Sequence, residues 1–145
     1  METKEKGGTV VTIDGVETRE KDGIIACVVG GIEYVNGNIH PITMDCHGVA
    51  INFPVCGLVL TADAKETAAG EYKGVNLVKT AFGQLPATDE ALLRIKAAFP
   101  QAIVIGSMVA ATAYPGDILA MVDAPGYERS AGPEKRKSLN IFLTF

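Results

Sequence analysis

The chain has 145 residues, the length of one ordinary domain, and its 48% hydrophobic and 21% charged content exclude a disordered polymer. A net charge of −4 disfavours electrostatic binding to nucleic acid or to an anionic membrane. The charged N-terminus is unlike a secretion signal, and no apolar run reaches the roughly 20 residues that span a bilayer. We therefore expect a single cytoplasmic domain over residues 1–145, with a flexible leader over residues 1–8.

The first half of the chain predicts short strands joined by turns. Asp14-Gly15 and Asn36-Gly37-Asn38 each lie between runs of β-branched residues, which is typical of β-hairpins. Pro54 divides a further apolar stretch, because proline cannot donate a hydrogen bond to a central strand pair. The predicted strands cover residues 9–13, 16–19, 24–29, 32–35, 39–44, 49–53 and 55–61.

One clear helix is predicted over about residues 89–99. Thr88 is a suitable N-cap, and acidic residues follow it in the first turn, where negative charge is favourable. Pro100 ends the helical pattern. Small and large apolar residues recur inside it at helical spacing: Ala91, Leu92, Ile95, Ala98 and Phe99.

The predicted helix lies between strands over residues 75–81 and 102–105, so residues 75–105 form a strand–helix–strand unit. If both strands joined one sheet in parallel, the crossover would be right-handed. A polar loop is expected before this unit, over residues 62–73. Residues 107–113 fit a helix and a strand equally well. The remaining elements are strands over residues 118–122 and 139–145, joined by a long loop over residues 123–138.

Many short strands with one clear helix favour an α+β fold. We expect a β-rich domain whose sheet is strongly bent or barrel-like. The order of strands in that sheet stays open, because pairing depends on a register that one sequence specifies weakly.

One short stretch holds both histidines, His40 and His47, and two of the three cysteines, Cys46 and Cys56. A zinc site made of these four side chains would need a turn at Cys46, because neighbours on a strand point to opposite faces. Their spacing also differs from that of the familiar zinc modules. Cys56, like Cys27, lies in an apolar run and is expected in the core.

Asp45 and His47 are two residues apart, so on a strand they would share one face. A carboxylate beside an imidazole can orient it for acid–base chemistry or for metal binding. Cys46 would face the other way, either as a core residue or as a reactive thiol. We therefore predict a catalytic group of His47, Asp45 and Cys46, and a metal pair of His40 and His47 that could hold a divalent cation. The alternative is that His47 makes ordinary structural hydrogen bonds.

Two classes of function fit these residues. The first is a small cytoplasmic enzyme that acts on a small polar metabolite through the His/Asp site, with or without a metal. The alternative is a non-catalytic module that binds a small ligand or assembles as a homo-oligomer. The mean hydropathy of +0.22 is high for a soluble domain and favours burial of apolar surface between copies of the chain. Neither reading includes a nucleic acid or a membrane as a partner.

Overall fold

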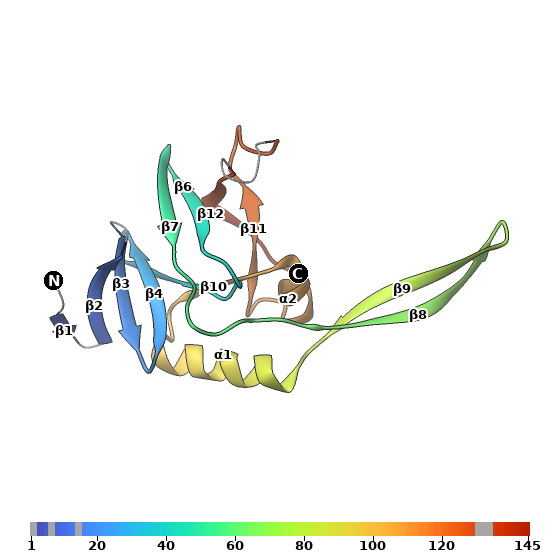
Figure 1. Cartoon of the computed structure of the whole chain (residues 1–145), viewed down its shortest axis with the longest axis horizontal. Coiled ribbons are helices and arrows are strands. Elements are labelled where there is room, and N and C mark those ends of the chain that lie inside the picture. The colour runs from blue at the N-terminus through green and yellow to red at the C-terminus, as the bar shows by residue number, and fades with distance from the viewer. Residues whose placement is uncertain (1–2, 6–7, 14–15, 130–134) are drawn as a thin grey trace.

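The computed structural model describes the backbone of residues 3–5, 8–13, 16–129 and 135–145, and the side chains from residue 16 onward within these ranges. In this part of the chain, ten strands form one bent sheet that is nearly closed into a barrel (Figure 1). The predicted α+β, β-rich class is therefore confirmed. The ten strands are β1 (Thr3–Glu5), β2 (Gly8–Ile13), β3 (Val16–Lys21), β4 (Ile24–Val29), β5 (Ile32–Asn36), β6 (Ile42–Cys46), β7 (Val49–Phe53), β10 (Ile103–Gly106), β11 (Leu119–Asp123) and β12 (Lys137–Leu143).

The order of strands across the sheet is β1-β2-β3-β4-β5-β10-β11-β12-β6-β7. The first five follow one another as antiparallel neighbours. β10 then inserts parallel to both β5 and β11, and β12 lies antiparallel to β11 and parallel to β6. At the far end, β7 comes back beside β3, which brings the sheet close to closure.

Two apolar cores lie on the two faces of this sheet. The inner core contains Tyr34 and Phe53, whose ring centroids are 5.4 Å apart, packed with Met44 and Leu139. The outer core lies between the sheet and two helices, α1 (Pro86–Ala98) and α2 (Met108–Ala113). Its members share deep burial; they include Ile24, Val35, Leu92, Ile95, Phe99, Ala110 and Ile118.

The strands β8 (Asp63–Tyr72) and β9 (Val75–Gly83) form a separate antiparallel hairpin. Figure 1 shows that this hairpin extends away from the rest of the domain as an arm. In β8 only Asp63 and Ala69 are half-buried, and in β9 only Phe82 is; every other residue is exposed. We call residues 63–83 the arm.

The predicted helix is confirmed, but its N-cap is wrong. α1 starts at Pro86, after Leu85, because proline at the first helical position supplies a helical φ and loses no needed N–H. Thr88 is buried inside the helix instead. Its hydroxyl donates to the carbonyl of Thr61 at 2.8 Å and accepts from the Thr61 N–H at 3.2 Å. Thr88 therefore attaches the helix to the segment that leads into the arm.

Three other predictions about local structure are wrong. The loop expected over residues 62–73 is strand β8, and the strand expected over residues 55–61 is a connecting segment without strand pairing. Asn36-Gly37-Asn38 does not make a hairpin, because β5 pairs with β4 and β10 and not with β6. β9 and β10 flank α1 as expected, but they belong to different sheets.

The undecided segment over residues 107–113 is settled as the short helix α2, whose N-cap Ser107 accepts a hydrogen bond from the N–H of Ala110 at 3.1 Å. The strands β2 and β3 pair as the predicted hairpin, whereas its Asp14-Gly15 turn lies outside the described residues. The leader expected over residues 1–8 also falls partly outside them, and its described part forms β1.

Candidate functional site

His47 lies in a turn, not on a strand face. It and Gly48 form the two-residue turn between β6 and β7, with φ angles of 50° and 86°. Two successive positive φ values are typical of the turn that best matches the twist of a hairpin. His47 is exposed there. The expectation that Asp45 and His47 share one face of a strand is therefore wrong, because β6 ends at Cys46 and the chain reverses at once.

Asp45 is held by an arginine from the other end of the sequence. Its Oδ1 lies 3.1 Å from Nη1 of Arg136, and its Oδ2 accepts the N–H of Gly48 at 3.3 Å. The same Nη1 donates to the Gly48 carbonyl at 3.2 Å, and the guanidinium lies 4.9 Å from the ring centre of Tyr127. Both oxygens of Asp45 are thus bonded, so this carboxylate stabilises the β6–β7 turn.

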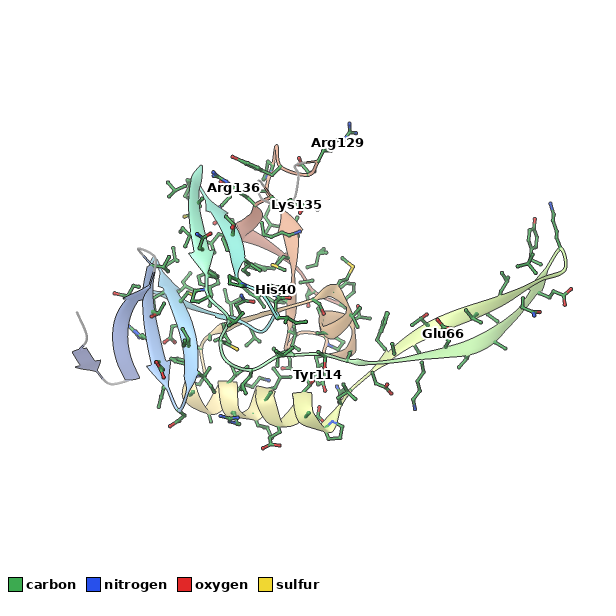
Figure 2. The ribbon with its side chains drawn as sticks, viewed as in Figure 1. His40, Glu66, Tyr114, Arg129, Lys135 and Arg136 are labelled. Atoms are coloured by element: carbon green, nitrogen blue, oxygen red, sulfur yellow. The ribbon has the colours of Figure 1, made fainter. Side chains whose placement is uncertain are left out.

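His40 lies at the opposite end of β6 from His47. The five residues of β6 separate them by about 16 Å, at roughly 3.3 Å per residue, which is too far for two ligands of one metal. Figure 2 shows His40 well apart from Arg136, which marks the His47 end. Among the described residues, no group of three or more His, Cys, Asp or Glu side chains could hold a metal ion.

The three cysteines fall into two environments. Cys27 and Cys56 are buried, as expected for core residues, and Cys46 is half-buried. Burial raises the pKa of the Cys27 thiol to about 12 and also raises the pKa of Cys56. A buried thiol with a raised pKa is a weak nucleophile. Of the three cysteines, Cys46 is therefore the one that a reagent in solution reaches most readily.

His40 does line a groove, which begins where β5 ends. The side-chain amide of buried Asn36 donates to the carbonyl oxygens of His40 at 3.0 Å and Phe53 at 3.4 Å. Its Oδ1 accepts the backbone N–H of Asn38 at 3.0 Å. These bonds shape residues 37–40 into one wall. The groove has a volume of about 350 Å³ and is lined by Gly37, Asn38, Ile39, His40, Ile42, Val59, Leu60, Thr61, Ser107 and Met121.

The opposite wall is the segment that leads from β7 to the arm. Its backbone is bonded to the end of β5: the Leu60 N–H donates to the Gly37 carbonyl at 2.9 Å, and the Cys56 N–H to the Asn36 carbonyl at 2.9 Å. The groove is mainly aliphatic, with a few hydroxyl, amide and imidazole groups among its lining side chains. Such a surface suits an apolar side chain that carries one hydrogen-bonding group.

The arm carries a second candidate surface, which the sequence analysis missed. Tyr72 and Val75 are directly paired across the hairpin, and Leu77 lies two residues after Val75. Paired residues and residues two apart share one face of a hairpin, so these three form an apolar tip. The sequence signal was present: Lys73-Gly74, with φ angles of 53° and 80°, is a two-residue turn between Tyr72 and Val75.

Comparisons with known proteins find no matching family model, no matching curated protein and no matching solved structure. In the described part of the chain, no helix is long and apolar enough to cross a membrane. The candidate surfaces therefore rest on their own chemistry: a turn around Asp45 and His47, an aliphatic groove beside His40, and an exposed arm with an apolar tip.

Proposed function

We propose that the protein is an assembly subunit that associates with further copies of itself through the arm. The observation that carries this proposal is a long hairpin with an apolar tip that packs against no other part of the described chain beyond its base. An isolated two-stranded hairpin is only marginally stable in water. An arm of this length is therefore best explained by a surface on another molecule that covers it.

The exposed edges of the arm support the same function. Each strand of the hairpin pairs only with the other, so both outer edges present unpaired N–H and C=O groups. Such edges readily add another strand. The arm also carries Asp63, Lys65, Glu66, Glu71, Lys73 and Lys79, so its acidic and basic side chains balance. A balanced arm can approach a like-charged copy without the repulsion that a net charge of −4 would otherwise impose.

The base of the arm is attached to the domain by side-chain hydrogen bonds, which suits an arm that must hold a defined direction toward another subunit. The side chain of Gln84, just after β9, donates to the carbonyl of Ala113 at the end of α2, at 3.3 Å. Thr88 of α1 bonds the segment before β8. Two helices therefore fix the direction in which the arm leaves the domain.

The other predicted function, an enzyme that uses His47, Asp45 and Cys46, stays a prediction. The geometry gives it less support, because Asp45 is occupied by Arg136 and His47 lies on an exposed turn. A small ligand in the groove beside His40 likewise stays a prediction. Cytoplasmic location is part of the same expectation.

The test is to measure the mass of the wild-type protein in solution and then to shorten the arm. Glu66 pairs with Thr80, so residues 67–79 can be replaced by the dipeptide Asn-Gly, which closes the remaining hairpin. Analytical ultracentrifugation should show an assembled wild type and a monomeric short-arm variant. The near-UV circular dichroism of the variant should lose only the contribution of Tyr72, because neither core includes the deleted residues.

Two outcomes would contradict the proposal. One is a wild-type protein that remains monomeric at high concentration. The other is a short-arm variant that assembles as well as the wild type. A point control uses Leu93, an exposed leucine on α1 that lies outside the arm; Leu93→Asp should leave the assembled mass unchanged.

A further inference from the structure

We propose that two copies exchange arms, so that the apolar tip of each arm enters the groove beside His40 of the other copy. This inference rests on the proposed function and specifies both the partner and the docking site. The partner is a second copy of this chain, related to the first by a twofold axis. The contact is then the same in both directions.

The tip has the chemistry of an inserted anchor. Tyr72, Val75 and Leu77 are 62%, 61% and 43% exposed. Tyrosine contributes a large apolar ring with one hydroxyl and loses little conformational entropy when it is fixed, which is why it is enriched at the centres of interfaces. The three side chains share one face, so they can enter a groove together.

The groove has the complementary chemistry. Ile39 and Val59 line it and are 69% and 48% exposed, so both offer aliphatic surface to an inserted side chain. Leu60 and Met121 lie along its lining. His40, Thr61 and Ser107 add hydrogen-bonding groups to the lining, which can pair with the hydroxyl of an inserted tyrosine.

The position of the groove explains why the contact can be mutual. Thr61 lines the groove, and β8 begins only two residues later at Asp63, so the groove lies at the base of the arm. Two arms that run side by side in opposite directions place each tip at the base of the other. The arm spans about 30 Å at roughly 3.3 Å per residue, so its tip cannot reach the groove of its own chain. Figure 2 shows the same separation, with Glu66 already out on the arm and His40 in the domain.

The amount of surface is also sufficient. A standard stable interface uses about 20–30 residues from each partner. The arm supplies about 20 residues, and the groove of the same chain adds a second patch to the same interface. In addition, the outer edges of two antiparallel arms can pair with each other. This pairing would satisfy the main-chain N–H and C=O groups that a single hairpin leaves unpaired along its outer edges.

A second groove on the molecule is one competing site for the tip. It has a volume of about 420 Å³ and lies where β7 approaches β3 and β4, lined by Val16, Glu17, Val28, Val29, Gly30, Val49, Ala50 and Ile51. It lies away from the base of the arm, at the edge strand β7, so antiparallel arms would not bring the tips to it. Its charged group is the Glu17 carboxylate, which suits an apolar tip less well than the hydroxyls beside His40.

Thiol cross-linking distinguishes the two grooves. All variants carry Cys46→Ser, because Cys46 is the half-buried native cysteine, and Lys73→Cys places a thiol at the tip without altering the three apolar residues. This tip thiol is combined with Thr61→Cys at the proposed groove or, as the matched control, with Ala50→Cys at the competing one. A short bismaleimide reagent should give a covalent dimer with Thr61→Cys and none with Ala50→Cys or with Lys73→Cys alone.

The outcomes separate the two proposals. A dimer by ultracentrifugation that cross-links through Ala50→Cys, or through neither position, would overturn the docking site and leave arm-mediated assembly in place. A wild type that is monomeric would overturn both. A covalent dimer through Thr61→Cys supports both.

Affinity measurements give an independent check. Tyr72→Asp and Val59→Asp should each raise the dissociation constant of the dimer about tenfold or more, because a carboxylate would be buried in an aliphatic contact. The dissociation constant of the double variant should be close to that of the weaker-binding single variant, because both substitutions disrupt the same contact. Additive losses would show that Tyr72 and Val59 act at separate places and would overturn the proposed docking.

Discussion

The phenolic oxygen of Tyr114 lies 2.7 Å from Oδ1 of Asp89, and this hydrogen bond joins the end of α2 to the first turn of α1. The same oxygen accepts the N–H of Leu85, the residue before α1, at 2.8 Å. Burial, and then the bond to Asp89, raises the pKa of Tyr114, so the hydroxyl keeps its proton and remains a donor. One side chain therefore fixes the start of α1, immediately after the arm.

Replacing Tyr114 by phenylalanine tests this role. Tyr114→Phe removes the hydroxyl and keeps the ring, so the Leu85 N–H loses its partner. The free energy of unfolding should fall by about 1–3 kcal/mol, the usual cost of leaving a buried polar group unsatisfied. Urea denaturation measures this change. Tyr127→Phe, which keeps the ring beside Arg136, is the matched control and should change the free energy of unfolding by less than about 0.5 kcal/mol.

Two side chains of α1 that are two residues apart should differ in how much they contribute to the free energy of unfolding, because only one is buried between the helix and the sheet. Ile95 is completely buried in the outer core, whereas Leu93 points to solvent. Ile95→Ala should lower the free energy of unfolding by about 2–5 kcal/mol, because it leaves a cavity in a packed core. Leu93→Ala should lower it by less than about 0.5 kcal/mol. Equal losses in thermal or urea unfolding would contradict this placement of α1.

Stability at alkaline pH should depend on Cys27. Burial, with a smaller effect from nearby Cys56, raises the pKa of Cys27 from 9.0 to about 12. The unfolded chain therefore loses this proton first, so stability that is present below pH 9 is lost as the pH rises from 9 toward 12. Between pH 8 and pH 10 the wild type should lose about 1.4 kcal/mol more than Cys27→Ala in the free energy of unfolding. Urea titrations in reducing buffer at both pH values test this, and parallel losses would refute it.

The pair of Asp45 and Arg136 should contribute to stability through direct coupling. Their side chains are 18% and 25% exposed, so water screens them less than a surface pair. A double-mutant cycle with Asp45→Asn and Arg136→Gln should give a coupling energy of about 1 kcal/mol. The matched control is the pair of Lys96 and Asp117, which is about half exposed and should give less than about 0.5 kcal/mol. A coupling no larger than that of the control would show that Arg136 does not hold the β6–β7 turn.

Local sequence patterns predicted the elements in which apolar residues form a compact run or recur at helical spacing. β4 over residues 24–29 and β7 over residues 49–53 were predicted with the bounds they have, because each is a compact β-branched run. α1 was predicted from the recurrence of apolar residues that do pack in the outer core. β4 and α1 carry their own signal of burial, whereas in β7 only Phe53 is buried.

The arm could not be recognised in the same way, because it has little burial to signal. β8 is rich in Ala, Glu and Lys, which are depleted in ordinary strands, and nearly all of it faces solvent. Its structure comes from its partner strand β9 and from the Lys73-Gly74 turn. A search for two-residue turns with glycine between β-branched or aromatic residues would have found it.

The candidate site was mispredicted where tertiary contacts override local preference. Asn36-Gly37 resembles a hairpin turn, yet the Asn36 side chain is buried and bonds both to nearby His40 and to Phe53, which is 17 residues away. Asp45 and His47 would share a face on a longer strand, but Gly48 allows the turn that separates them. The first outcome depends in part on a distant partner, Phe53, whereas the His47-Gly48 turn is local and the glycine was its sequence signal.

The parallel pairing of β12 with β6 has a consequence for how the chain folds. Lys137 pairs with Met44, so this contact closes a loop of roughly 90 residues, and the pairing of β10 with β5 closes one of nearly 70. Contacts of such high sequence separation form slowly, because the entropy of the long loop must be lost before they stabilise anything. The β8–β9 hairpin joins near neighbours in the sequence and needs no such closure. We therefore expect the arm to form transiently while the sheet is still open, and to persist only when its surface is covered, because a lone hairpin is marginally stable.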